Sequence, residues 1–330
     1  MTPRRISRRT ALRAAMIAAA TLAAPASFAQ AKWPMERTMT IVVPFAAGSA
    51  FDNVARVLAD GIRRKYGNTV VVENKVGASG GIGQNFVAKA APDGYTFIVS
   101  TPGPAANNML TFRSLPYNPM TDFSFVGMVL RDPIVMAVRR DMPVNSFREF
   151  LAHAKANPGK ITMGNPGHGS TAHMTQMALQ DLARIDLNII PYKTPTQVMQ
   201  DLIGQQIDAG MALVGNLMPA IRAGHLKPLV TFGDKRDPQL PNVPTLVEQG
   251  YNFSSQPWAG VQGPKGIPRE IIVEMNRTIN EILRQKENVD KLAAGGVTAA
   301  TSTPEEFEQI VRAEITKWRP VVTKYNITQE

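Results

Sequence analysis

The chain offers few residues for covalent chemistry. It has no cysteine, which excludes thiol nucleophiles, disulfide bonds and thiolate metal sites. A Gly-x-Ser-x-Gly pattern at 77–81 matches the nucleophile turn of hydrolases, in which the serine stands directly between a strand and a helix. Here residues 73–76 separate the preceding strand from the glycines. This spacing does not fit the hydrolase turn. A secreted serine hydrolase using Ser79 in Gly77-Ala78-Ser79-Gly80-Gly81 is therefore only the alternative to a binding function.

Histidines and glycines provide no stronger motif. His168 and His173 flank the start of a predicted helix with no acidic residue between them, whereas a metal site needs several ligands converging from one side. The glycines at 77–83 do not match a dinucleotide-binding loop, because Phe86 stands where the third glycine belongs. We expect no catalytic residue, no metal and no cofactor, and a protein that is not an enzyme.

Four loops share a different pattern. Each follows a predicted strand, consists of small and hydroxyl residues, and opens a predicted helix; they span 46–52, 77–83, 100–108 and 164–171. Backbone N–H groups at a helix N-terminus attract anions, and ligands of open α/β sheets bind at the carboxyl ends of the strands. Each loop alone is equally consistent with a capped turn. Because none of them contains Arg or Lys, the set predicts a small anion held by peptide N–H groups, hydroxyls and water.

The elements that would position these loops alternate between strand and helix patterns. In the first part, strand patterns lie at 39–44, 69–72 and 96–100, and helical patterns begin at Asp52 and Gln84. Further along, helical patterns lie at 146–156, 171–182 and 196–204, and strand patterns lie at 161–163, 188–191 and 209–214. This alternation is typical of an α/β protein with mostly parallel sheets flanked by helices.

Two features indicate that one domain is inserted into the other. Strand-like runs around 126–138 are broken at Asp132-Pro133, which suggests a crossover, and a proline-rich stretch precedes Trp258. Apolar stripes at helical spacing then cover 272–283 and 307–325, as expected for helices that pack on a core. The sequence predicts a discontinuous first domain, 32–135 with 258–330, and a second domain, 136–257, with a ligand cleft between them.

Residues 1–31 have the features of an export signal. A basic start precedes an uncharged apolar run at 14–24, and small-residue cleavage sites end at Ala29 and Ala31. The segment 7–13 resembles a twin-arginine motif, although an ordinary secretory route is equally compatible. The apolar run is shorter than the roughly 20 residues of a membrane span. We expect a mature protein that is periplasmic, soluble and, without a lipobox cysteine, not lipid-anchored.

The charge distribution argues against a nucleic-acid partner. The formal net charge is +10, but the predicted signal contains five arginines and no acidic residue, so the remaining chain carries +5. The longest basic run in the remaining chain is the three residues Arg63-Arg64-Lys65, and the other basic residues are scattered singly or in pairs. A nucleic-acid-binding surface would need a clustered basic patch.

Short motifs occur in a characteristic order along the mature chain. They are IVVPFAAG at 41–48, VVVENK at 70–75, PDGYT at 92–96, YNP at 117–119, PYK at 191–193, LPNVPT at 240–245 and WAG at 258–260. Together they resemble the substrate-binding proteins of tripartite tricarboxylate transporters, also called Bug-type receptors, over essentially all of residues 33–327. The resemblance implies a monomeric, two-domain, type II periplasmic binding protein that closes on a small organic carboxylate and delivers it to membrane transporter subunits.

The resemblance also implies a set of ligand-binding positions. By position these are Ala46, Ala47, Gly48, Ser49, Phe51 and Asp52 after the first strand, Ser100 and Thr101 after the third, Asn165, Gly169, Ser170 and Thr171 in the second domain, and Asp208 on the far wall. Phe51 stands where such receptors commonly have a small polar residue. We therefore expect backbone N–H groups at 47–49 to hold one carboxylate, and Phe51 to favour an aromatic or extended apolar acid. The sequence does not identify the ligand.

Overall fold

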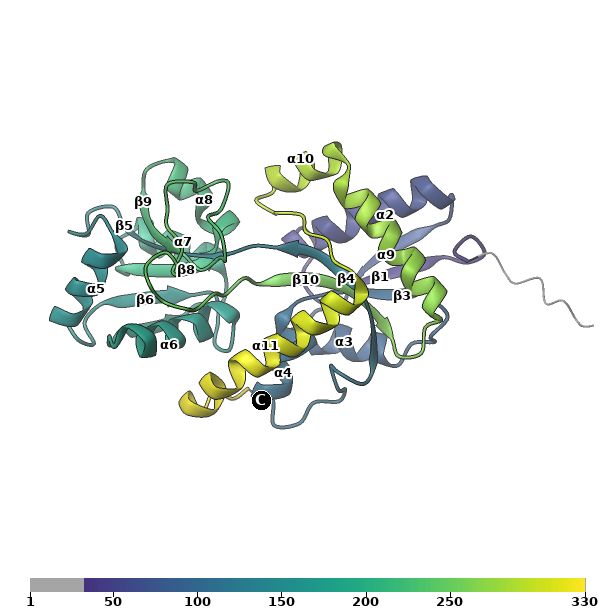
Figure 1. The fold of residues 1–330 in the computed structure, drawn as a ribbon, viewed down its shortest axis with the longest axis horizontal. Coiled ribbons are helices and arrows are strands. Elements are labelled where there is room, and N and C mark those ends of the chain that lie inside the picture. The colour runs from purple at the N-terminus through teal and green to yellow at the C-terminus, as the bar shows by residue number, and fades with distance from the viewer. Residues whose placement is uncertain (1–32, 330) are drawn as a thin grey trace, which may run out of the picture.

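Five strands form the first of two sheets in the described chain, residues 33–329 of a computed structural model (Figure 1). In spatial order they are β2 (Val70–Asn74), β1 (Met39–Val43), β3 (Thr96–Ser100), β10 (Trp258–Pro264) and β4 (Phe123–Arg131). β1 pairs in parallel with β2 and β3, whereas β10 is antiparallel to β3 and β4. The carboxyl ends of β1, β2 and β3 therefore lie at one edge of the sheet.

The second sheet repeats the same plan. In spatial order its strands are β7 (Asn188–Pro191), β6 (Thr162–Asn165), β8 (Ala209–Leu213), β5 (Ile134–Arg139) and β9 (Leu226–Thr231). β6 pairs in parallel with β7 and β8, and β5 is the reversed strand between β8 and β9. The predicted two-domain α/β fold is confirmed, with one antiparallel strand in the fourth position of each sheet.

The chain crosses between the two sheets twice. It leaves the first sheet through Asp132-Pro133, between β4 and β5, and returns through Pro257 into β10. The two crossings touch, because the backbone N–H of Asp132 donates to the carbonyl of Pro257 at 3.0 Å. This strand membership supports our proposed domains, 32–135 with 258–330 and 136–257. β5 begins at Ile134, so the first boundary belongs slightly earlier than the sequence suggested.

Helices cover both sheets. Around the first sheet lie α2 (Ala50–Tyr66), η1 (Ala78–Gly80), α3 (Gly81–Ala88), η2 (Gly103–Asn107), α4 (Asn108–Thr111), α9 (Arg269–Arg284), α10 (Lys286–Ala294) and α11 (Pro304–Tyr325). Around the second lie α5 (Phe147–Ala156), α6 (Thr171–Ala183), α7 (Pro195–Ile203) and α8 (Val214–Arg222). None of the helices described within 33–329 combines the length and apolar character of a membrane span.

Local sequence explains where the helices near the cleft begin. Ser49 accepts the N–H of Asp52 and caps α2, whose buried Val54, Leu58 and Ile62 pack on β1. The helix ends at Gly67, whose φ of 73° suits glycine. The two caps and the packing on β1 fix where α2 begins and ends.

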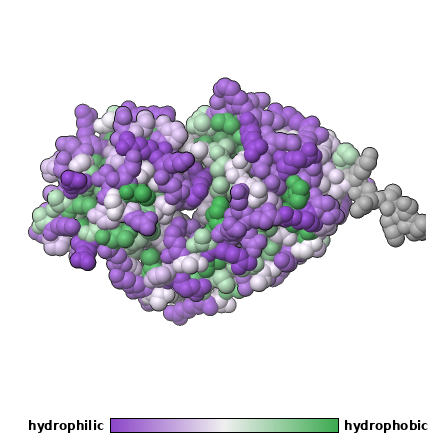
Figure 2. All heavy atoms as spheres, viewed as in Figure 1, coloured by the Kyte–Doolittle hydropathy of each residue, from purple (hydrophilic) through white to green (hydrophobic). Residues whose placement is uncertain are grey.

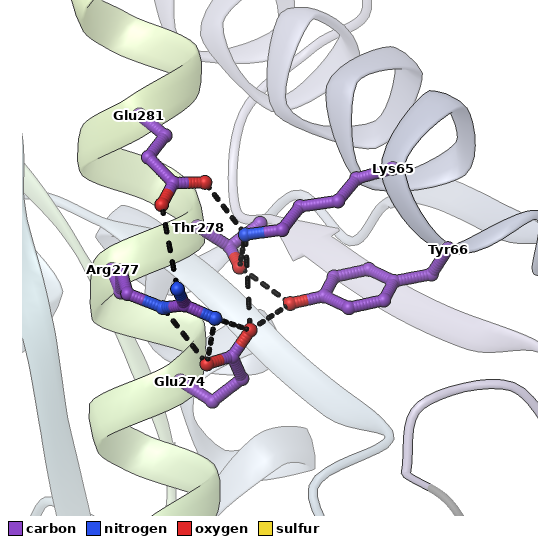
Figure 3. Close-up of polar contacts among 6 residues, drawn as sticks. All are labelled: Lys65, Tyr66, Glu274, Arg277, Thr278 and Glu281. Atoms are coloured by element: carbon purple, nitrogen blue, oxygen red, sulfur yellow. Dashed lines mark hydrogen bonds and ion pairs between the residues drawn. The ribbon is translucent and has the colours of Figure 1, made fainter.

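A polar cluster fastens α2 to α9 (Figure 3). The Tyr66 hydroxyl donates to Glu274 and lies 2.7 Å from the hydroxyl of Thr278. Lys65 Nζ donates to Thr278 at 3.0 Å and to Glu281 at 2.6 Å. Contacts that join two helices at several points hold α2, and with it the loop before it, in a fixed position.

Helix α11 extends from the first domain to the second (Figure 1). Its early turns pack on β4, and its last turns meet α6. There Trp318 and Val322 pack with Met174, and Lys324 Nζ lies 2.5 Å from Asp181. Charged and polar residues dominate the face of the molecule in Figure 2, with apolar residues scattered among them.

Candidate ligand-binding cleft

A cleft of about 550 Å³ lies between the two domains, a size suited to a small organic ligand. One wall contains Phe45, Phe51, Ser79, Thr101, Pro102, Gly103, Pro104, Asn107, Asn108, Leu130, Pro257, Trp258 and Gln329. The other contains Ile134, residues 166–172, Lys193, Pro195, Leu213 and Asn216. All four loops singled out in the sequence contribute lining residues.

The lining favours an anion with an apolar portion. None of the described lining residues is acidic, and Lys193, on the exposed rim, is the one Lys or Arg among them. The rings of Phe45 and Phe51 lie together, 4.7 Å between centroids, and provide an aromatic surface. A carboxylate with a hydrocarbon body matches both features.

Two buried side chains in this cleft have polar atoms without protein partners. Asn107 is 2% exposed, and neither its Nδ2 nor its Oδ1 has a hydrogen-bond partner among residues 33–329. Trp258 is equally buried, packs edge-on against Phe307, and likewise has no described partner for its Nε1. An unmade buried hydrogen bond costs about 1–3 kcal/mol, so both groups are suited to bind a ligand acceptor.

The loop after β1 already holds a carboxylate, that of Asp52. The Gly48 N–H donates to Asp52 Oδ2 at 2.8 Å, and the Ser49 N–H donates to the carbonyl of Ala46. Burial raises the pKa of Asp52, but hydrogen bonds from Arg56, Gly48 and Asn74 outweigh it and hold the pKa below its ordinary value.

Consequently two N–H groups of the predicted cradle at 47–49 already have partners within the loop, Gly48 with the Asp52 carboxylate and Ser49 with the Ala46 carbonyl. Ala46, Ala47, Gly48, Ser49 and Asp52 do not line the cleft, whereas Phe51 does.

In the loop after β3, Thr101 lines the cleft and Ser100 does not. The Ser100 hydroxyl donates to Gln84 Oε1 at 2.7 Å, within a buried network. Ser79, on the neighbouring loop, also lines the cleft, and its hydroxyl donates to Gln329 Oε1 at 2.7 Å. That partner is an amide oxygen rather than a histidine or carboxylate, so this contact supplies no general base.

The second-domain loop places three predicted residues in the cleft, namely Gly169, Ser170 and Thr171. Ser170 caps α6 by accepting the His173 N–H at 3.1 Å. The Gly169 N–H donates to Nδ1 of His173, which must therefore lack a proton at that atom. Burial, and then the nearby His168, lower the pKa of His173 to about 4, consistent with a neutral ring.

Asn165 shapes this loop from beneath. It is fully buried, donates to Gln176 Oε1 at 2.8 Å and accepts the Gly167 N–H at 2.9 Å. Both bonds hold the turn that leads to Gly169. Asn165 itself does not line the cleft.

Asp208 lies at the opposite edge of the second sheet. It precedes β8, accepts the backbone N–H of Thr162 at the start of β6, and pairs with Arg139 at 3.1 Å. Ligand-binding loops follow the strands, whereas Asp208 stands before one. We therefore correct this prediction and leave Asp208 out of the proposed site.

Sequence reasoning did not assign several of the polar lining residues to ligand binding. Among them are Asn107, Lys193, Asn216, Trp258 and Gln329. Asn107 lies in one of the four loops, and Lys193 and Trp258 lie in two of the sequence motifs, but the sequence does not show that their side chains face the cleft. Gln329 had no signal in the sequence. Residues 33–329 also contain no cluster of three or more His, Asp or Glu side chains arranged to hold a metal.

Comparison with known proteins identifies the family. Residues 54–327 match the sequence model of the tripartite tricarboxylate transporter family receptor. The chain is 36% identical to Protein BugT of Bordetella pertussis over 308 residues, 93% of this chain and 94% of that protein.

Solved structures agree. The R. palustris protein Rpa4515 with adipate is 32% identical, with a TM-score of 0.78 over 90% of this chain and 99% of that one. MatC from Rhodopseudomonas palustris with bound malate is 31% identical, with a TM-score of 0.72 over 87% and 99%. The chain thus belongs to the tripartite tricarboxylate transporter receptor family, a family of two-domain periplasmic solute receptors.

Proposed function

We propose that this chain is an exported receptor that binds one small organic carboxylate in the cleft between its domains. The observation that carries the proposal is the pair of buried, unpartnered donors, Asn107 Nδ2 and Trp258 Nε1, in a cleft without acidic lining residues. A carboxylate oxygen would satisfy both donors. The aromatic pair of Phe45 and Phe51 would contact the hydrocarbon part of the ligand.

The second domain adds hydroxyl groups to the same ligand. Ser170 and Thr171 line the opposite wall at the start of α6, where the helix dipole favours negative charge. Hydrogen bonds to a charged acceptor contribute about 1.5–3 kcal/mol each. Several of them, less the cost of association, are compatible with micromolar affinity, about −8.2 kcal/mol.

Location and partners complete the proposal. Residues 1–31, which lie outside the described part of the structure, would direct export by either of two routes. The mature chain would then act in the periplasm as a monomer and deliver its ligand to the membrane subunits of a tripartite tricarboxylate-type transporter. The adipate and malate in two similar structures support a carboxylate as the ligand class.

Titration calorimetry of residues 32–330 tests the proposal. The panel contains adipate, malate and benzoate, with glucose as an uncharged control. We expect saturable binding of at least one carboxylate to one site, no heat with glucose, and binding at least about 10-fold weaker in Asn107→Leu. Absence of binding by carboxylates, together with acyl-ester turnover that disappears in Ser79→Ala, would favour the serine hydrolase instead.

A further inference from the structure

We propose that Gln329 is a closure residue whose side-chain amide joins the two walls of the cleft. Its Oε1 accepts a hydrogen bond of 2.7 Å from Ser79 in the first-domain wall. Its Nε2 lies against Gly169 in the second-domain wall, only 2.3 Å from where a Cβ on Gly169 would stand. One side chain therefore contacts both domains inside the cleft.

The backbone of Gln329 is fixed to the first domain. After α11 the chain turns at Asn326, which has a φ of 49°, and the N–H of Gln329 donates to the carbonyl of Thr111 at 2.8 Å. Gln329 also forms a parallel bridge with Phe112. Because its main chain is anchored in this way, Gln329 projects its side chain across the cleft from a defined point.

The Ser79 side of the contact is held in a strained conformation. Ala78 and Ser79 both have positive φ, 47° and 49°, which is unfavourable for residues other than glycine. The amide of Asn108 donates to the Ser79 carbonyl at 3.3 Å and supports this turn. Such strain persists only where the surroundings determine the conformation, and here it presents the Ser79 hydroxyl to Gln329.

On the second-domain side, a side chain at Gly169 would displace the Gln329 amide from this position. Gly169 has a φ of 71°, which favours glycine, and its N–H is bonded to His173, so its backbone is held in place beside the Gln329 amide. Separation of the two domains would pull Gly169 away from Gln329. The contact thus stabilises the domain spacing of this structure relative to a more open one.

The inference concerns the cleft of the proposed function, but its test needs no ligand. Because the chain lacks cysteine, Lys89→Cys and Gln200→Cys, both at exposed positions of different domains, accept one spin label each. Distances are then measured by double electron–electron resonance. Gln329→Ala should lower the ratio of closed to open molecules about five-fold, equivalent to about 1 kcal/mol, because it removes the side chain that contacts Gly169 across the cleft. The exposed neighbour Thr328 provides the control, since Thr328→Ala should leave the ratio unchanged.

A second variant separates the specific contact from a general loss of packing. Ser79→Ala should shift the ratio in the same direction, because the Gln329 amide loses the bond that orients it toward Gly169. The double variant Ser79→Ala with Gln329→Ala should shift the ratio no further than Gln329→Ala alone, because Ser79 acts only through Gln329. Unchanged distances in Gln329→Ala, or additive shifts in the double variant, would overturn the inference. Failure of every carboxylate to bind would contradict the proposed function without altering these distances.

Discussion

Asn107 and Asn108 are adjacent, almost fully buried asparagines with different hydrogen bonding, and the same substitution should affect them oppositely. Asn107 is 2% exposed and has two unpartnered amide atoms. Asn108 is 1% exposed, and its Nδ2 donates to the Ser79 carbonyl and the Tyr117 hydroxyl. We predict that Asn107→Leu stabilises the ligand-free protein while weakening ligand binding.

The magnitude follows from the burial of these groups. Removing unpartnered amide atoms relieves about 1–3 kcal/mol, so the free energy of unfolding of Asn107→Leu should rise by up to that amount. Asn108→Leu leaves the Ser79 carbonyl without its donor and should lower the same free energy by about 1 kcal/mol. Both variants introduce the same larger side chain, so its packing cost is shared between them.

The effect of Asn107→Leu on ligand binding should be opposite to its effect on stability. Loss of a donor to a charged acceptor costs about 1.5–3 kcal/mol, which weakens binding by Asn107→Leu about 10- to 150-fold. Urea denaturation of the ligand-free proteins and titration calorimetry with the best-binding carboxylate provide the two measurements. The reasoning would be refuted if Asn107→Leu were destabilised as much as Asn108→Leu, or bound the carboxylate as tightly as the unaltered chain.

Three further predictions address Asp132 at the first crossing between the sheets, His173 beside the second-domain loop, and Phe51 in the apolar wall. Burial raises the pKa of Asp132 to about 6, above its ordinary 3.8, so the folded protein loses stability as pH rises from 4 to 6 and this carboxyl ionises. Asp132→Asn should therefore raise the free energy of unfolding, measured by urea denaturation, by up to about 3 kcal/mol at pH 7.5 and by far less at pH 4. Burial and His168 lower the pKa of His173 to about 4 from its ordinary 6.5, so the stability that the neutral ring provides above pH 6.5 should be lost as pH falls toward 4. The melting temperature of the unaltered chain should fall over this interval relative to that of His173→Gln, and an equal response of both proteins would contradict the prediction. Phe51→Ser should weaken benzoate binding by about 1 kcal/mol or more and spare malate; equal losses in calorimetry would show that Phe51 does not contact the ligand.

Much of the fold could be predicted because its signals are local. The β-branched run of β1 and the capping Ser49 with Gly67 define a strand and a helix from adjacent residues. Helix α8 was not predicted, since Gly215 and Pro219 interrupt its pattern, and packing on α7, β5, β8 and β9 stabilises it. The reversal of β10 depends on the return of the chain from the second domain, which no local pattern records.

In the candidate site, too, the residues with local sequence signals could be predicted and the others could not. Phe51, Thr101 and the loop at 169–171 stand beside recognisable strand ends, so their place in the cleft could be predicted. Trp258 lies within a strand, and the last turns of α11 determine where Gln329 lies, so tertiary structure alone brings them together. The sequence did not reveal that the Asp52 carboxylate accepts the Gly48 N–H of its own loop.

Electron density from a crystal of residues 32–330, grown with a saturating concentration of the tightest-binding carboxylate, tests the central claim most directly. The account predicts density for one molecule in the cleft, with a carboxylate oxygen within about 3.2 Å of Asn107 Nδ2 or Trp258 Nε1. The hydrocarbon part should lie against Phe51. A ligand bound elsewhere, or one in the cleft whose carboxylate contacts neither donor, would contradict it.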